Sequence, residues 1–108
     1  MIKMLNQVVI AGRLVNDPQV EENDDRKVTT ITVAVPRSYK NIDGEYETDF
    51  ITCTLWNSIA ESTAEYCKKG DIVGVKGRIQ TTTVDDKTTM TVIAEKVSFL
   101  SSRRSEED

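Results

Sequence analysis

The segment from Asp49 to Trp56 alternates between two kinds of side chain. The apolar set is Ile51, Cys53 and Leu55, and the other set is Phe50, Thr52, Thr54 and Trp56. Because successive side chains of a strand point to opposite faces, one face would be core and the other would carry two aromatic rings. The rings would lie roughly 20 Å apart. Two alternatives stay open: both rings are buried under a second layer, or both are exposed to flat partners such as unpaired nucleobases.

The rest of the chain has the residue pattern of a small all-β domain with one helix. We predict strands over residues 7–15, 28–35, 45–56, 71–83 and 89–100. Between the third and fourth strands, Ser58 and Glu61 form a predicted capping box, Lys68 and Lys69 fall in the last turn, and Gly70 follows the helix. Three strands, a helix and two strands is the order of the five-stranded OB barrel.

Turn residues separate these elements. Gly12 predicts a bulge or bend in the first strand, and a polar loop is expected from Asn16 to Lys27. Pro36 stops the second strand or marks an edge, and Asp43-Gly44 is typical of a hairpin turn. A second turn is expected over residues 84–88. Gly74 and Gly77 lie within a strand, where they would permit coiling of the sheet.

Length and composition indicate one domain. The 108 residues suit an OB domain over residues 1–100, followed by a disordered polar tail over residues 101–108. No apolar run is long enough to span a membrane and no signal peptide is evident, so we expect a cytoplasmic protein. Cys53 and Cys67 are the only cysteines, and Cys53 on a core face predicts a buried free thiol.

The acidic residues are concentrated in two places. The net charge is −4, but seven of the 18 acidic residues lie in residues 21–25 and 106–108. Without them, 11 acidic residues remain against 14 Lys and Arg residues, so the net charge of the rest of the chain is +3. A mildly basic body is compatible with phosphate binding, although charge alone would not indicate it.

Catalytic and metal-binding patterns are missing. The chain has no histidine, and no serine lies in a nucleophile motif. The acidic stretch from Glu21 to Asp25 lacks the glycine and the spacing of a calcium loop. We therefore expect no enzyme activity, no metal and no cofactor.

Basic and aromatic residues instead gather around the second, third and fourth strands. A charged groove with stacking platforms is the arrangement that binds single-stranded nucleic acid. The predicted stacking residues are Tyr39, Phe50 and Trp56, and the predicted phosphate-binding residues are Arg13, Arg37, Lys40, Lys76 and Arg78.

Several blocks resemble one known family. The blocks are Asn6-Gln7-Val8, Gly12-Arg13-Leu14, Asp17-Pro18, residues 33–40, Asp49-Phe50-Ile51 through Leu55-Trp56, Ala60-Glu61, Lys69-Gly70 and residues 75–79. They are similar, in order and spacing from Leu5 to about Leu100, to the bacterial single-stranded DNA-binding proteins. The resemblance implies an OB fold, usually a homotetramer, that protects single-stranded DNA in replication, repair or recombination. It implies stacking roles for Tyr39, Phe50 and Trp56.

The chain departs from that family pattern at two places. Val84 stands where a further stacking aromatic is common, which predicts weaker binding or a smaller footprint. The last residues, Ser105 to Asp108, lack the Pro-Phe of the usual acidic tip, so we expect no recruitment of partner enzymes by that route. A shortened form resembles an accessory, phage, mobile-element or competence-type paralogue.

Two other functions stay open at this point. One is a primosomal accessory protein of the same fold, usually a dimer, which hands strands to a helicase. The other is an OB module that binds protein or carbohydrate, with Phe50 and Trp56 as its anchors.

Overall fold

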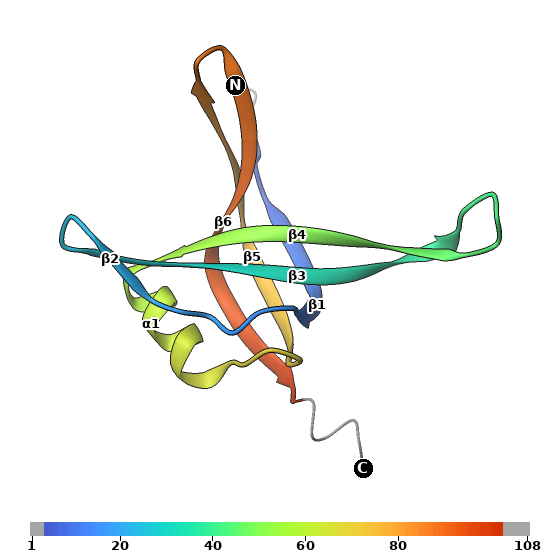
Figure 1. The fold of residues 1–108 in the computed structure, drawn as a ribbon, viewed down its shortest axis with the longest axis horizontal. Coiled ribbons are helices and arrows are strands. Elements are labelled where there is room, and N and C mark those ends of the chain that lie inside the picture. Colours follow the sequence, from blue (N-terminus) through green and yellow to red (C-terminus); the bar gives the residue numbers. More distant parts are fainter. Residues whose placement is uncertain (1–3, 103–108) are drawn as a thin grey trace.

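The computed structural model describes residues 4–102. It contains one helix and six strands within that range, and Figure 1 shows their arrangement. The elements are β1 (Val8–Leu14), β2 (Glu21–Asn23), β3 (Arg26–Lys40), β4 (Tyr46–Trp56), α1 (Asn57–Tyr66), β5 (Ile72–Val84) and β6 (Lys87–Ser101).

Five of the strands close into a ring. The sheet runs β1-β5-β6-β4-β3-β2, and β1 also pairs with β3 through Arg13–Ala34 and Leu14–Val33. All pairings are antiparallel except the short β4–β6 pairing, in which Cys53 and Thr54 lie beside Val92 and Ile93. This ring, with its helix between β4 and β5, is the predicted OB architecture.

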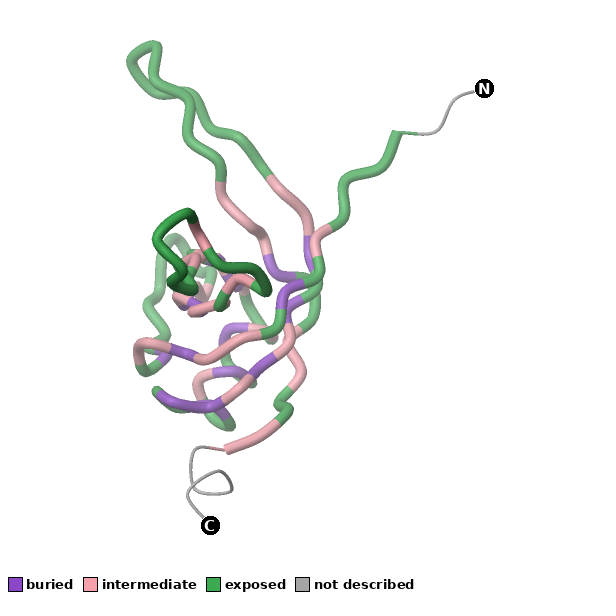
Figure 2. The backbone as a smooth tube through the Cα atoms, turned by 90° about the vertical axis from the view of Figure 1, so that its right-hand side faces the viewer, coloured by how far each residue is buried: buried purple, intermediate pink, exposed green. Residues whose placement is uncertain are grey.

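The core fills the inside of the ring. Ile31, Val33, Cys53, Leu55 and Val73 have no exposed surface. Each comes from the apolar side of an alternating strand, and α1 adds the buried Ala60. Figure 2 shows buried backbone in the barrel and exposed backbone along the projecting hairpins. The prediction that Cys53 is a buried free thiol is confirmed.

Two long hairpins extend beyond the barrel, one horizontal and one upright in Figure 1. We call residues 36–49 the β3–β4 arm and residues 80–91 the β5–β6 arm. The β3–β4 arm turns at residues 41–45, where Gly44 has φ 78°, so the hairpin predicted from Asp43-Gly44 is confirmed. In the β5–β6 arm every residue from Gln80 to Met90 is exposed.

Two strands differ from the prediction. β3 runs from Arg26 through Pro36 to Lys40, so Pro36 does not stop it. At Pro36 the strand pairs only with Thr48 of β4, so its other side is an unpaired edge. Proline has no backbone N–H to donate, and an edge is where a strand tolerates that loss. The predicted polar loop also contains β2, which pairs with β3 across Asp24 and Asp25. Both aspartates have positive φ, 51° and 67°, the conformation of a type I′ turn.

The helix boundaries were predicted wrongly. Trp56 is the N-cap and makes no side-chain cap hydrogen bond, so Ser58 lies inside the helix and the capping box does not form. The chain instead turns through Asn57, at φ 55°, whose side-chain oxygen accepts the Lys27 amide at 3.4 Å. At the other end α1 stops at Tyr66, so the predicted last-turn lysines follow the helix.

Gly70 belongs to the connection from the helix to β5, and does not follow the helix directly as predicted. It has φ 98°, and its amide donates to the Leu14 carbonyl at 2.9 Å. The Asp71 amide donates to the Lys68 carbonyl at 3.0 Å, which closes a turn around Gly70. This turn fixes the start of β5 against the end of β1.

Close contacts inside the ring depend on two glycines. A Cβ added at Gly12 would overlap the carbonyl of Ala34, and one added at Gly77 would overlap the carbonyl of Ile93. Gly12 therefore lets β1 approach β3, and Gly77 lets β5 approach β6. At Gly74 an added Cβ would make only ordinary contacts, so the predicted role in coiling is not required there.

The structure describes only the beginning of the predicted C-terminal tail. Ser101 is the last residue of β6, and residues 103–108 of the predicted tail lie outside the described residues. Between residues 4 and 102, no helix has the length and apolar character that a membrane crossing requires.

Candidate nucleic-acid interface

The outer face of β4 carries exposed aromatic residues, as the alternation predicted. Phe50 is 66% exposed, whereas Cys53 and Leu55 on the opposite face have no exposure. Trp56 ends the strand beside Val28 of β3 and is half-buried. The alternative in which a second layer covers both rings does not apply to Phe50 within this chain.

Phe50 lies in a row of directly paired residues that crosses three strands. Ala34 of β3 pairs with Phe50 on one side and with Arg13 of β1 on the other. Two strand spacings, about 10 Å, separate the Arg13 and Phe50 backbones. Beside this row is a shallow groove of about 320 Å³, lined by Ala11, Gly12, Arg13, Ala34, Pro36, Thr48 and Ile72. Arg13 is held at this groove by donating to the Gly70 carbonyl at 2.7 Å.

A second groove lies on the other side of Phe50, where the β5–β6 arm leaves the barrel. Its volume is about 350 Å³, and it is lined by Phe50, Ile51, Thr52, Ile79, Met90, Thr91 and Val92. Ile79 is half-buried here. Met90, which is 70% exposed, was not predicted to belong to this surface. Its signal was weak because a single methionine in a threonine-rich strand has no distinctive spacing.

Arg37 faces away from the aromatic face. Pro36 pairs with Thr48, so Arg37 takes the opposite face of the sheet. Its guanidinium donates to Asp49 at 2.8 and 3.1 Å and to Glu47 at 2.6 Å. We call Arg37, Glu47 and Asp49 the arm clamp. Hydrogen bonds from Arg37 hold the pKa of Asp49 below its ordinary value.

Lys76 and Arg78 also lie apart from Phe50. Lys76 pairs with Val9 of β1 and with Lys96 of β6, on the wall formed by β1, β5 and β6. Arg78 donates to Gln80 at 2.9 Å, and its Nε lies 3.8 Å from Glu95. The structure therefore brings Arg13 to the aromatic face but does not bring Arg37, Lys76 or Arg78 there.

Tyr39 and Lys40 lie on the β3–β4 arm. Tyr39 is 64% exposed and belongs to β3, which continues beyond residue 35, the predicted end of that strand. The strand register is irregular between Pro36 and Lys40, and normal pairing resumes where Lys40 faces Tyr46. Sequence reasoning missed Tyr46, although it continues the Phe50 alternation four residues earlier.

The tip of the β5–β6 arm has no aromatic ring. Val84 is 63% exposed and precedes a turn in which Asp85 and Asp86 have φ of 50° and 64°. Threonines line both strands, with Thr83 and Thr88 hydroxyls 2.9 Å apart. A valine presents no π-face to a base, so this arm offers no stacking platform at its tip.

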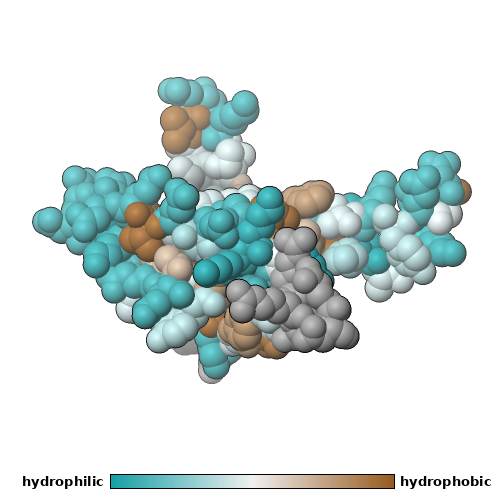
Figure 3. Space-filling view, turned by 60° about the horizontal axis from the view of Figure 1, so that its bottom comes forward, coloured by the Kyte–Doolittle hydropathy of each residue, from teal (hydrophilic) through white to brown (hydrophobic). Residues whose placement is uncertain are grey.

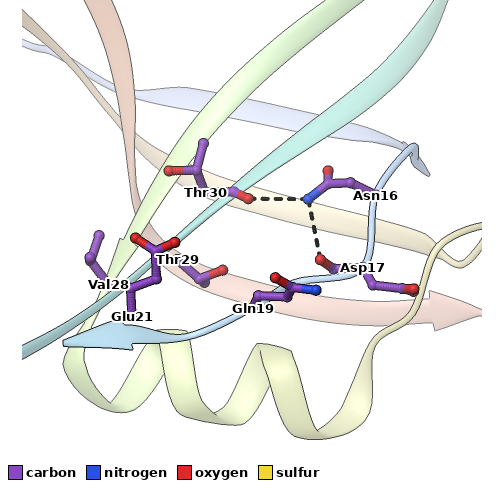
Figure 4. A pocket seen from close by; sticks show the side chains of 7 residues that line it. All are labelled: Asn16, Asp17, Gln19, Glu21, Val28, Thr29 and Thr30. Atoms are coloured by element: carbon purple, nitrogen blue, oxygen red, sulfur yellow. Dashed lines mark hydrogen bonds between the residues drawn. The ribbon is translucent and has the colours of Figure 1, made fainter.

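A polar pocket of about 220 Å³ lies on a different edge of the sheet (Figure 4). Here Asn16 substitutes for a neighbouring strand: its oxygen accepts the Thr32 amide at 2.9 Å, and its nitrogen donates to the Thr30 carbonyl at 3.2 Å. The pocket is the gap between that contact and the β2–β3 hairpin. Figure 4 shows Glu21 and Gln19 along its rim. It is separate from the face of Phe50.

Reactive and metal-binding side chains are also few. Burial raises the pKa of Cys53 to about 11, and burial and Asp71 raise the pKa of Cys67. Among residues 4–102 no cluster of His, Cys, Asp or Glu has the arrangement of a metal site.

Figure 3 shows a mostly hydrophilic surface on one side of the molecule, including the β3–β4 arm at the right.

Known proteins are similar to this chain in sequence. The model of the single-strand binding protein family matches residues 5–100. Single-stranded DNA-binding protein B of Bacillus subtilis is 45% identical over 95 residues, which are 87% of this chain and 84% of that protein. The single-stranded DNA-binding protein of Halalkalibacterium halodurans is 43% identical, over 95% of this chain and 65% of that protein.

A solved structure has the same fold. A deletion mutant of the single-stranded DNA binding protein from Thermus aquaticus superposes with a TM-score of 0.78 at 22% identity. The match covers 92% of this chain and 52% of that one. The family match and the two sequence relatives establish that the chain belongs to the single-strand binding protein family.

Proposed function

We propose that this protein binds single-stranded DNA with little dependence on base sequence. The observation that carries the proposal is Phe50, an exposed aromatic ring between two shallow grooves on a sheet face. Stacking on such a ring suits every base, because every base has a π-face. Arg13 on the same row supplies positive charge for the phosphates. Family membership supports the same function.

The biological role we propose is protection of exposed single strands during replication, repair or recombination. We propose that it acts as a homo-oligomer, a tetramer in preference to a dimer. Within the described chain, β1 from Val8 to Gly12 pairs only with β5, so its other edge is open. Val9 on this strand is 76% exposed. A second copy of β1 could add to that edge.

Trp56 provides the test, because it is the only tryptophan of the chain. We would titrate the protein with an oligothymidine and follow Trp56 fluorescence at low and high salt. Quenching that weakens as salt rises is expected, because displaced counterions make phosphate binding salt-dependent. A duplex of equal length serves as the control and should bind more weakly.

Failure of the proposal has a distinct result. If fluorescence does not change at micromolar DNA, and anisotropy of labelled DNA also shows no binding, the face of Phe50 has another partner. Binding that is insensitive to salt would likewise contradict the phosphate contacts.

A further inference from the structure

Tyr46 extends the aromatic row of β4 onto the β3–β4 arm. It is the first residue of β4 and is 61% exposed. Tyr46, Thr48 and Phe50 alternate with Glu47 and Asp49, so the tyrosine shares the face of Phe50 and not that of the arm clamp. Four residues along a strand place Tyr46 about 13 Å from Phe50. The aromatic surface therefore continues outward from the barrel.

A cation accompanies this ring. Lys40 pairs directly with Tyr46 in the register, and its ammonium nitrogen lies 5.6 Å from the centre of the tyrosine ring. No acidic side chain of residues 4–102 forms an ion pair with Lys40. An aromatic face and an ammonium group beside each other match the two parts of a nucleotide, its base and its phosphate.

The backbone beneath this pair is held in place before any ligand arrives. On the opposite face the arm clamp joins β3 to β4, because Arg37 pairs there with the carboxylates of Glu47 and Asp49. At the turn, the Asn41 side chain accepts the amides of Asp43 and Glu45 at 2.9 and 3.0 Å. An exposed subsite on a fixed arm loses less conformational entropy on binding than one on a mobile loop.

We propose that Tyr46 and Lys40 form an additional nucleotide subsite on the β3–β4 arm. A base of the same single strand that crosses Phe50 stacks on Tyr46, and the adjacent phosphate pairs with Lys40. The subsite rests on the proposed function, since it extends that interface. It supplies a stacking platform to a chain whose other arm ends in Val84.

The test compares two tyrosines of similar exposure. Tyr46→Leu is measured beside Tyr66→Leu, because Tyr66 ends α1 and is 70% exposed. The ligand is an oligothymidine of about 16 nucleotides, the upper end of an OB-fold site. Tyr46→Leu should lower affinity about tenfold, a typical effect of one stacked base, whereas Tyr66→Leu should leave it unchanged. Tyr46→Phe, which keeps the ring, should retain the affinity.

Lys40→Gln tests the phosphate contact separately. Losing one phosphate contact to a single strand should reduce the slope of log affinity against log salt by about 0.7. An unchanged slope would remove Lys40 from the subsite.

Photocrosslinking of the unmodified protein avoids the risk that a variant distorts the arm. With an oligonucleotide that carries 5-iodouracil, a product on the peptide containing Tyr46 is expected. Products confined to peptides from the barrel, or equal affinities for Tyr46→Leu and Tyr66→Leu, would overturn the subsite.

Phe50→Ala is measured in the same series. If the wild type binds and Phe50→Ala weakens it, the proposed function stands even when the subsite fails.

Discussion

The two arms have similar construction but different surfaces. Both are antiparallel hairpins that extend a pair of barrel strands into solvent. The β3–β4 arm has the exposed ring of Tyr46 on the face of Phe50 and a charged clamp on the other face. The β5–β6 arm has threonines on both strands and an aliphatic residue at its tip. The difference indicates that one arm presents an aromatic ring, whereas the other presents hydroxyl and methyl groups.

The largest expected effect contrasts one apolar residue from each side of the second groove. Phe50→Ala should reduce affinity for oligothymidine about tenfold or more, because a stacked base loses its platform. Met90→Ala on the β5–β6 arm removes a side chain of similar exposure, 70% against 66%, and should change affinity by less than about threefold. Fluorescence anisotropy of labelled DNA measures both. Equal losses would show that the β5–β6 arm contributes to binding as much as Phe50 does.

A smaller loss is expected when the arm clamp is opened. Asp49→Asn removes a negative charge, which by charge alone would strengthen binding to DNA. We expect affinity to fall about threefold, because the clamp holds the strands that present Phe50 and Tyr46. Arg37→Gln should lower the affinity for DNA by a similar factor and should leave the slope of log affinity against log salt unchanged. Tighter binding by Asp49→Asn would contradict the positioning role.

A gain of similar or smaller size is expected from the other arm. Val84→Trp should tighten binding about threefold, since an exposed tip would acquire a stacking surface. Ser62→Trp, at an exposed position of α1, is the control for added aromatic surface and should leave affinity unchanged. No gain from Val84→Trp would mean that DNA does not reach the β5–β6 arm.

The smallest effect concerns acid. Asp49 has a lower pKa folded than unfolded, because Arg37 donates to its carboxylate. The stabilisation by this pair is therefore complete above the unfolded pKa, about 3.9, and is lost as pH falls through the lower folded value. NMR of the Arg37 Nε–H signal should show a bonded proton at neutral pH and its loss only in that acidic range. Loss near pH 6 would contradict the depressed pKa.

Local alternation was enough to predict which residues of β4 share a face, and the order of the elements predicted the barrel, whereas the exposure of Phe50 stayed open. A strand in which Cys53 and Leu55 alternate with Phe50 and Thr52 can bury only one set, and the structure follows that division. The hairpin at Gly44 was also predictable, because an Asp-Gly pair tolerates a positive φ and is typical of such turns. These features depend on residues close together in the sequence.

The charged residues could not be assigned from sequence because their placement depends on register. Arg37 was predicted to bind phosphate, but pairing of Pro36 with Thr48 places it on the reverse face with Asp49. Lys76 and Arg78 fall on the far wall because β5 is separated from β4 by β6. The helix start was missed because the chain turns at Asn57, with positive φ, so that Trp56 and not Ser58 is the N-cap.

The burial of both cysteines has a practical consequence for following motion. Cys53 has no exposed surface and Cys67 is 4% exposed, and the pKa of each thiol is raised. The thiolate form of cysteine is the nucleophile that attacks maleimide reagents, so neither native residue should react in the folded protein. A cysteine introduced by Ile42→Cys would therefore be the one accessible thiol of the described chain. A single dye attached there, observed with Trp56 in the barrel, would report the distance between arm and barrel directly.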